Sequence, residues 1–324
     1  MRHARLVIVV LLAMAALTGA SFVTSLVPSR ADDTPRASPT PDPNAPVSPP
    51  VTGTVPADRF DSLESIIDAD TRTQVTNTSA EPWKKIVNLD IDFDGDLFPE
   101  AGCTGSMIGP KLVLTAGHCV YDPETLDWAS YVWVTPGQNG LTMPYGWQRV
   151  GAASLRSSNG WVLSGNPNFD WGAIVLPDKT LYNQTGAFAL GVADDLYLTG
   201  AGVNIAGYPG DKTYGTMWAA SGPVTAFTST MISHEVDTIA GQSGAPVWAS
   251  EGSNRYIVGV HAYGVKNPYC NPGDNCGTRM TLGLASTLES LGANPTLISA
   301  VAHPLPPLRP AQAPHQPPPA TFTR

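Results

Sequence analysis

The chain has 324 residues, which is enough for one large domain or two small ones. Charged residues make up 14% of the chain and the formal net charge is −9, which argues against a nucleic-acid-binding protein. Low charge together with 31 glycines and many serines and threonines is typical of a secreted protein.

The N-terminus predicts a secretory signal peptide. Arg2 and Arg5 precede an apolar run that is too short for a comfortable membrane span. Cleavage sites follow both Ala20 and Ala31, and we favour Ala31 because it ends a small-x-small sequence. We therefore expect residues 1–31 to be a signal peptide and the protein to be secreted, with an uncleaved membrane anchor as the alternative.

Two proline-rich segments flank the part that can fold. Residues 32–64 and 303–324 contain little to bury, so we expect a disordered propeptide and a disordered tail. The remaining segment, 65–302, has the size of one two-barrel β domain.

This segment reads as many short strands separated by Gly, Pro, Asn and Asp. The expected strands are Lys85–Ile91, Lys111–Thr115, Tyr131–Thr135, Gly172–Leu176, Val203–Gly207, Gly222–Phe227, Ala245–Trp248 and Tyr256–Ala262. Helical patterns are confined to Leu282–Leu291 and Pro295–Val301. The pattern predicts an all-β barrel or sandwich with a C-terminal helix.

Four cysteines behind a signal peptide indicate two disulfides, for which three pairings exist. We favour the local pairing of Cys103 with Cys119 and of Cys270 with Cys276. A zinc site is the alternative, but the CxxC spacing that zinc sites use is absent.

An acidic loop contains Asp90, Asp92 and Asp94 before a glycine, like the start of a calcium loop. The EF-hand template requires glutamate at its twelfth position, which here is Ala101, whereas Glu100 comes one residue early. We favour a solvated hairpin tip over a metal site. Calcium binding at this loop is the alternative, and it makes a calcium-regulated surface protein a rival hypothesis.

Three residues offer the parts of a nucleophilic active site. Ser243 lies in Gly241-Gln242-Ser243-Gly244, a sequence suited to a turn that presents a hydroxyl and main-chain N–H groups. His118 follows an apolar strand and precedes a cysteine, so a disulfide would pin the backbone that holds this base. Asp170 directly precedes a buried strand, where its carboxylate can orient the imidazole of His118.

The order His118, Asp170, Ser243 resembles that of the chymotrypsin-like serine proteases, and within them the secreted bacterial glutamyl endopeptidases. The segments that carry this likeness are Arg72–Thr78, Cys103–Lys111, Thr115–Cys119, Tyr208–Lys212, Asp237-Thr238, Gly241–Gly244 and Gly277–Arg279. The resemblance covers about residues 65–290. It implies two six-stranded antiparallel β-barrels with the triad between them, and an oxyanion hole formed by the N–H groups of Gly241 and Ser243.

Two interpretations of substrate specificity compete. Asp237 lies six residues before Ser243, the spacing at which trypsin-like enzymes carry the aspartate that selects Lys and Arg. The resemblance instead assigns His261 and Thr238 to a pocket that receives a glutamate carboxylate. A neutral histidine and a hydroxyl can donate hydrogen bonds to an anion without burying a second full charge.

The resemblance also implies a maturation site. Relatives begin their mature chain at a position that corresponds to Ser65, and Glu64 precedes it. A Glu-specific protease could therefore cut its own propeptide, and in some relatives the freed amine helps to bind the substrate. Gln242 replaces the aspartate with which trypsin-like enzymes bind their new N-terminus, so that activation switch is missing.

These observations predict a secreted serine endopeptidase that cleaves after glutamate through a covalent acyl-enzyme, with aspartate as a second candidate residue before the cut. No cofactor is required, the partners are protein or peptide substrates, and we expect a monomer. The alternatives are the same fold with trypsin-like or small-residue specificity, and an exported binding protein on a catalytically dead scaffold.

Overall fold

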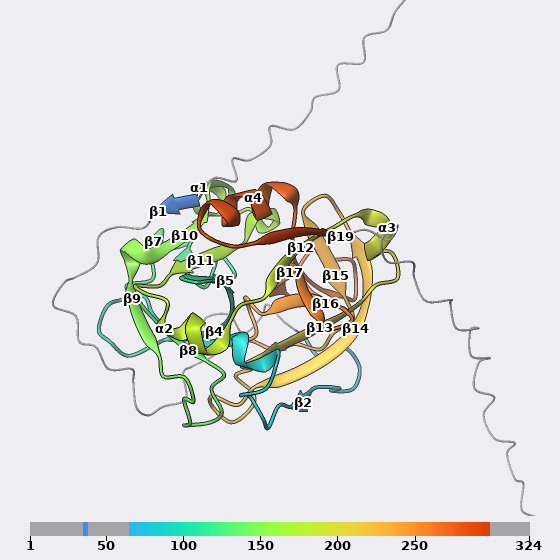
Figure 1. Ribbon diagram of the computed structural model, residues 1–324. Helices are drawn as coiled ribbons and strands as arrows, with labels where there is room; N and C mark the ends of the chain where they lie inside the picture. The colour runs from blue at the N-terminus through green and yellow to red at the C-terminus, as the bar shows by residue number, and fades with distance from the viewer. Residues whose placement is uncertain (1–34, 38–64, 299–324) are drawn as a thin grey trace, which may run out of the picture. The chain divides into compact units, whose positions relative to one another are not determined.

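The computed structural model describes residues 35–37 and 65–298 (Figure 1). The predicted signal peptide, Glu64 and the predicted proline-rich tail lie outside the described residues, as does all of the predicted propeptide except the strand Pro35–Ala37. Among the described residues, no helix is long and apolar enough to cross a membrane.

The first sheet is an open, antiparallel half-barrel. Its eight strands are β1 (Pro35–Ala37), β3 (Ile86–Asp92), β4 (Ala101–Gly109), β5 (Leu112–Thr115), β8 (Tyr131–Pro136), β9 (Gln148–Gly151), β10 (Leu155–Ser158) and β11 (Gly172–Val175). They follow the order β1-β10-β11-β5-β4-β3-β8-β9. Strand β1 pairs with the outer edge of β10, and β9 lies at the other end of the sheet, where it pairs with β8.

The second sheet contains a closed barrel. It comprises β2 (Thr73–Gln74), β12 (Ala189–Ala193), β13 (Gly202–Gly207), β14 (Trp218–Phe227), β15 (Met231–His234), β16 (Pro246–Glu251), β17 (Asn254–Tyr263), β18 (Asn275–Arg279) and β19 (Pro295–Ile298). The six strands β13 to β18 form an antiparallel ring that the pairing of β16 with β17 closes. Strand β12 pairs parallel to β17, and β19 parallel to β12.

The remaining elements are short. They are a hairpin of β6 (Tyr121–Asp122) and β7 (Asp127–Trp128), the helices α1 (Asn159–Ser164), α2 (Thr180–Thr185), α3 (Asp195–Leu198) and α4 (Leu282–Ser290), and the 3-10 turns η1 (Trp83–Lys85), η2 (Ala152–Ser154) and η3 (Pro167–Phe169). Helix α4 confirms the predicted C-terminal helix, and the side chain of Thr281 caps it by accepting a hydrogen bond from Leu284 N at 3.1 Å.

The predicted helix at Pro295–Val301 is wrong. Residues 295–298 form β19, which lies against β12 beside α4 (Figure 1). Proline fits the first residue of a strand, and the free edge of β12 offers hydrogen-bond partners that a short isolated helix would lack.

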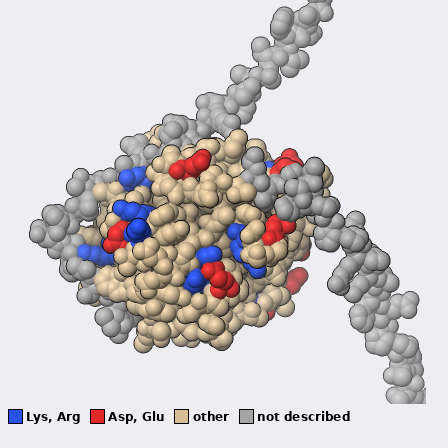
Figure 2. Space-filling model, in the orientation of Figure 1, with Lys and Arg blue, Asp and Glu red and all other residues tan. Residues whose placement is uncertain are grey.

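Each predicted strand is present, and the fold class is confirmed, with one closed barrel and one half-barrel in place of two closed ones. The barrel β13 to β18 has its own core, in which Val203, Ile205, Val247 and Val258 are almost fully buried. On the face shown in Figure 2, Lys and Arg are scattered among Asp and Glu, and most of the surface is uncharged.

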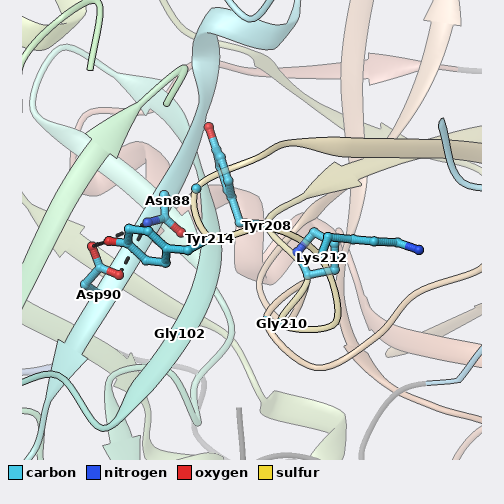
Figure 3. Close-up of a pocket in the computed structure, with 10 residues that line it drawn as sticks. Asn88, Asp90, Gly102, Tyr208, Gly210, Lys212 and Tyr214 are labelled. Atoms are coloured by element: carbon cyan, nitrogen blue, oxygen red, sulfur yellow. Dashed lines mark hydrogen bonds between the residues drawn. The ribbon is translucent and has the colours of Figure 1, made fainter. Parts of the chain in front are cut away.

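A pocket of about 60 Å³ opens where the segment 208–215 meets β3 and β4 (Figure 3). Gly241 forms part of its wall. Asp90 lies here, where Tyr214 Oη donates a hydrogen bond to its carboxylate at 2.9 Å. Burial raises the pKa of Asp90 to about 6, against the effect of hydrogen bonds from Tyr214 and Asn88.

The acidic loop forms a separate group. Carboxylate oxygens of Asp92, Asp94, Asp96 and Glu100 lie within 4.8 Å of one another. Asp92 accepts hydrogen bonds from Gly95 N at 2.6 Å and Leu97 N at 2.8 Å, which is the hydrogen bonding of a tight hairpin tip. Asp90 is therefore not part of this group, although the sequence suggested grouping it with Asp92 and Asp94.

Candidate active site

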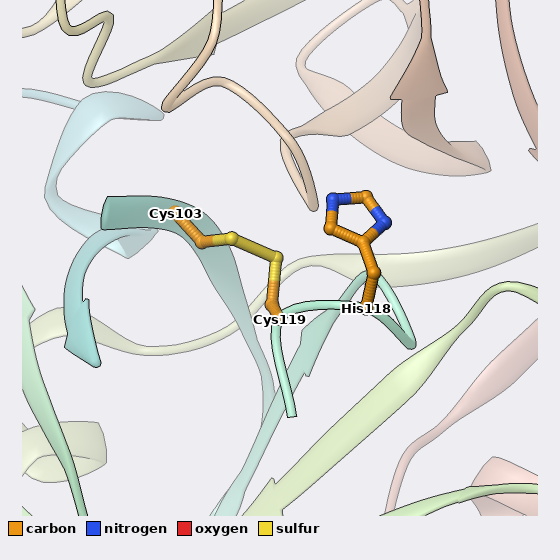
Figure 4. A group of neighbouring side chains, drawn as sticks. All are labelled: Cys103, His118 and Cys119. Carbon is orange, nitrogen blue, oxygen red and sulfur yellow. A yellow bond between two sulfur atoms is a disulfide. The ribbon is translucent and has the colours of Figure 1, made fainter. Parts of the chain in front are cut away.

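His118 is fixed at the end of β5 by a disulfide. Cys119 bonds to Cys103 of β4 with an S–S distance of 2.04 Å, and Cys270 bonds to Cys276, which is the local pairing that the sequence predicts. Figure 4 shows the imidazole of His118 beside the first disulfide. A ring nitrogen of His118 and the two sulfurs lie within 4.8 Å of one another, but sulfurs in a disulfide are not thiolate ligands for a metal.

Asp170 orients His118 through two contacts. Its Oδ2 lies 2.8 Å from His118 Nδ1, and its Oδ1 accepts a hydrogen bond from His118 N at 2.9 Å. The carboxylate is fully buried between η3 and β11. Gly117 makes this approach possible, because a Cβ there would lie 2.8 Å from Asp170 Oδ1.

Two further side chains hold Asp170, and sequence reasoning missed both. Tyr263 Oη donates a short hydrogen bond to Asp170 Oδ2, and Thr278 Oγ1 donates to the main-chain oxygen of Asp170 at 3.0 Å. Burial, and then the charge of Asp170, raise the pKa of Tyr263 well above its ordinary value, so the phenol stays protonated as a donor. A bulge between His261 and Tyr263 redirects this strand end, and no local pattern announces it.

Ser243 lies in a turn that glycine makes possible. Gly241 and Gly244 have φ angles of +98° and +83°, in the left-handed region that L side chains rarely adopt. Space is also lacking, because a Cβ on Gly244 would lie 2.1 Å from Thr115 Oγ1 and 2.2 Å from Thr104 O.

The turn joins the two sheets and places Ser243 beside the disulfide that neighbours His118. Thr104 N in β4 donates to Ser243 O at 2.8 Å, and Gly244 N donates to His261 O in β17 at 2.8 Å. Ser243 O also contacts the sulfur of Cys119 at 3.7 Å. The fully buried Ser243 therefore packs directly against the disulfide that holds His118.

The N–H of Gly241 has no acceptor among the residues that the structure describes. The segment behind it is tightly packed, since a Cβ on Gly241 would lie 2.5 Å from Tyr208 O and 3.1 Å from Gly210 N. Gly210 N in turn donates to Ala240 O at 2.7 Å. A main-chain donor is thus held rigidly next to the serine, as charge stabilisation at a reacting carbonyl requires.

His261 and Thr238 are buried next to this turn. His261 N donates to Ala245 O at 3.0 Å, and Thr238 is also fully buried, with an Oγ1 that has no hydrogen-bond partner in the described part of the chain. Burial, and then the neighbouring His234 and His118, lower the pKa of His261 well below its ordinary value. His261 is therefore neutral at pH 7.

A second buried histidine, His234 of β15, packs against the ring of His261. The two ring centroids are 5.3 Å apart. His234 Nδ1 accepts a hydrogen bond from Val236 N at 3.2 Å, which leaves the ring proton on Nε2. Burial lowers the pKa of His234 to about 4, against the attraction of Asp274. Sequence reasoning missed His234, because its spacing to Ser243 follows no motif.

Asp237 is engaged by the segment that begins the folded part of the chain. Its Oδ1 accepts from Ile67 N at 2.7 Å, and its Oδ2 accepts from Thr71 N at 2.8 Å and Thr71 Oγ1 at 2.6 Å. The residue is only 2% exposed. Both carboxylate oxygens therefore have partners within the chain.

The same segment runs past Thr238. Ser65 O accepts hydrogen bonds from Asn275 Nδ2 at 2.7 Å and from Thr238 N at 3.3 Å. Asn275 Nδ2 also donates to Val236 O at 2.9 Å, so it bridges Ser65 to the segment before the serine turn. The first described residue after the predicted propeptide is thus fixed beside the candidate pocket.

Comparisons with known proteins agree with this geometry. A family model described as Trypsin matches residues 72–280. The chain is 40% identical to a glutamyl endopeptidase of Bacillus licheniformis over 225 residues, which are 68% of this chain and 66% of that relative. It is 33% identical to a Bacillus subtilis protein named extracellular metalloprotease, over 69% of each chain.

A solved structure of a Glu endopeptidase in complex with MPD superposes with a TM-score of 0.61 at 29% identity, covering 70% of this chain and 98% of that one. The family match spans both sheets and the elements that hold His118, Asp170 and Ser243. The chain therefore belongs to the trypsin family of chymotrypsin-like serine proteases.

Proposed function

We propose that the protein is a secreted serine endopeptidase that cleaves peptide bonds after glutamate. Four observations support this function: the contacts of His118 with Asp170, the packing of Ser243 against Cys119, the burial of Thr238 and His261 beside the turn, and the similarity to a Bacillus licheniformis glutamyl endopeptidase. The two disulfides fit an oxidising, extracellular compartment.

In the proposed reaction, His118 takes the proton of Ser243 as the hydroxyl attacks the carbonyl carbon of the substrate. Asp170 holds the imidazole in one orientation and stabilises its charged form. The N–H groups of Gly241 and Ser243 stabilise the negative oxygen of the tetrahedral intermediate. His118 then protonates the leaving amine, and water hydrolyses the acyl-enzyme with His118 again acting as the base.

The hydrogen bonds of Asp237 are the observation that favours cleavage after glutamate over cleavage after lysine or arginine. Ile67 and Thr71 already use both of its oxygens, so pairing with a cationic substrate would require breaking these bonds. Thr238 and the neutral His261 instead offer donors to a carboxylate. A site formed by these two residues would therefore suit an anionic side chain.

The proposed mechanism uses no cofactor. The Bacillus subtilis relative is named a metalloprotease. In the described part of this chain, the two groups of possible metal ligands are His118 with the disulfide sulfurs and the acidic loop. Neither contains the two or more histidines that catalytic zinc sites of proteases use. Protein or peptide substrates are the partners that the proposed reaction implies.

We also propose that the enzyme cuts the Glu64–Ser65 bond during its own maturation. The position of Ser65 beside Thr238 supports a new N-terminus close to the pocket. If Glu64→Gln protein were still cut at this bond and kept full activity, self-processing at Glu64 would be wrong.

Digestion of a defined protein by the purified mature form tests the specificity, with the new peptide termini read by mass spectrometry. We expect cuts after glutamate. Cuts after lysine or arginine would contradict the assignment of His261 and Thr238, and an absence of cuts with both disulfides intact would support a dead binding scaffold.

Variants of the triad test the mechanism independently. Ser243→Ala and His118→Ala should lower kcat by several orders of magnitude, about 10⁴-fold or more, with the melting temperature preserved. Ser290→Ala, which removes an exposed hydroxyl at the end of α4, is the matched control and should leave kcat unchanged. A mild loss in the first two variants would contradict the assignment.

A further inference from the structure

Arg72 makes a buried cluster directly behind the serine turn. Its side chain is fully buried, although it carries a full positive charge. It bonds to Asp70 through Nε at 2.9 Å and Nη2 at 3.0 Å, and to Asp211 through Nη1 at 3.0 Å and Nη2 at 2.6 Å. Lys212 contacts both aspartates, at 3.0 and 3.4 Å, so two cations face two anions.

One contact of this cluster reaches the residue next to the nucleophile. Arg72 Nη1 donates to Oε1 of the fully buried Gln242 at 3.3 Å, and the same oxygen accepts from Ile239 N at 3.1 Å. Gln242 thereby ties the start of the turn to a guanidinium that belongs to a distant part of the chain. The two residues are 170 positions apart.

The contact with Asp211 fixes the other side of the turn. Asp211 belongs to the segment that backs Gly241, in which Gly210 N bonds to Ala240 O. A single guanidinium therefore holds both the residue between Gly241 and Ser243 and the segment against which Gly241 packs. Its planar fork suits this task, because it makes several hydrogen bonds in fixed directions.

We propose that Arg72 is a positioning residue for the turn Gly241–Gly244 and that it holds the Gly241 N–H in the orientation that stabilises the oxyanion. This inference rests on the proposed function. In trypsin-like enzymes an aspartate at the position of Gln242 binds the new α-amine. Gln242 has no carboxylate for that contact, and Arg72 anchors it through a side chain of the same chain instead.

The electrostatics of the cluster favour this role. Burial alone would lower the pKa of Arg72, but hydrogen bonds to Asp70 and Asp211 raise it above its ordinary value, so the side chain stays charged. Asp70 and Asp211 are about one-third exposed, with side-chain accessibilities of 34% and 38%. If the guanidinium were removed, water could still solvate these two carboxylates. The fully buried Gln242 would lose a hydrogen-bond donor that water cannot replace.

The test compares Arg72→Met, Arg72→Lys and the wild-type protein by kinetics and by amide hydrogen exchange. For Arg72→Met we expect kcat to fall about 10²-fold with little change in KM, because small displacements of catalytic groups cost about this much. The affinity for a peptide aldehyde, whose adduct places an oxygen at the oxyanion position, should fall by a similar factor. Exchange should accelerate in the peptide that spans residues 239–246.

Arg72→Lys keeps the charge but loses the fork, so an intermediate loss of kcat and of exchange protection is expected. Leu198→Ala, in α3, is the control: it opens a cavity in the second barrel and lowers stability without touching the turn, and its kcat should match the wild type. If Arg72→Met does not fold, Arg72→Lys and Asp211→Asn provide the same comparison.

Unchanged kcat and unchanged protection of residues 239–246 in Arg72→Lys or Arg72→Met would overturn the inference. A loss in kcat equal to that of Leu198→Ala would also overturn it, since instability would then explain the effect. If the wild type cleaves no substrate, the proposed function fails, and the exchange experiment still decides whether Arg72 positions the turn.

Discussion

Asp237→Asn distinguishes the two interpretations of the pocket. Asp237 accepts three hydrogen bonds, from Ile67 N, Thr71 N and Thr71 Oγ1, and is 2% exposed. Asparagine keeps the shape but has one acceptor oxygen, so its NH₂ group must face at least one of these donors. Hydrogen bonds to a charged group contribute about 1.5–3 kcal/mol each, and we expect a loss of about 2–3 kcal/mol.

For a domain of this size, such a loss lowers the melting temperature by about 4–12 °C. The segment that includes Ile67 and Thr71 should also exchange its amide hydrogens faster. The preference for glutamate should remain, because His261 and Thr238 are unchanged. Scanning calorimetry, hydrogen exchange and digestion of a defined protein measure these three quantities.

Asp195→Asn is the matched control, since Asp195 is 74% exposed and pairs with Arg279 at the surface. Exposed ion pairs contribute about 0–1 kcal/mol, so its melting temperature should barely change. The reasoning is refuted if Asp237→Asn keeps the stability of the wild type and changes cleavage after lysine or arginine, as a trypsin-like pocket requires.

Three further variants probe the site and its supports. The pKa of His234 is about 4 in the folded protein, whereas an unperturbed histidine has a pKa of 6.5. Between these pH values only the unfolded chain binds the proton, so His234 lowers the free energy of unfolding by about 3 kcal/mol as the pH falls from about 7 to about 4. His234→Asn should remove that part of the pH dependence of the urea midpoint; an identical dependence would contradict the buried, neutral assignment. Tyr263→Phe removes a buried donor to Asp170 and should lower kcat about tenfold with KM unchanged, so equal kcat values would show that His118 alone orients the carboxylate. Gly244→Ala should prevent folding, because its Cβ would lie 2.1 Å from a neighbouring oxygen. Gly252→Ala is the control: Gly252 also has a positive φ but lies in open space, so the substitution should lower stability by about 1 kcal/mol. Similar melting temperatures for the two variants would refute the steric argument.

Local sequence was sufficient to predict eight of the strands, helix α4 and both disulfides, and it named the three candidate triad residues; strands such as β4, β10 and β18 were not predicted. Each of these features has a signal within a few neighbouring residues: alternation of apolar residues, a cysteine beside His118, glycines on both sides of Ser243, and an apolar strand after Asp170. Hydrophobic pattern and turn chemistry act over such short ranges, so they can be read without the fold.

The partners of these residues depended on the tertiary structure. Asp237 is bound by Ile67 and Thr71 from more than 160 residues away, and Arg72 reaches Gln242 over a similar separation. The placement of Tyr263 on Asp170 follows from a strand bulge that no local pattern predicts.

The open first sheet and strand β19 were likewise decided by the fold. Strand β1 pairs with the edge of β10, and β12 offers a free edge to residues 295–298. Edge pairing depends on which hydrogen-bonding groups remain unpaired after the rest of the chain has folded. The sequence alone therefore determined which residues could take part in chemistry. Tertiary contacts determined which of them are left for a substrate, because a buried polar group must form hydrogen bonds with the partners that the fold places beside it.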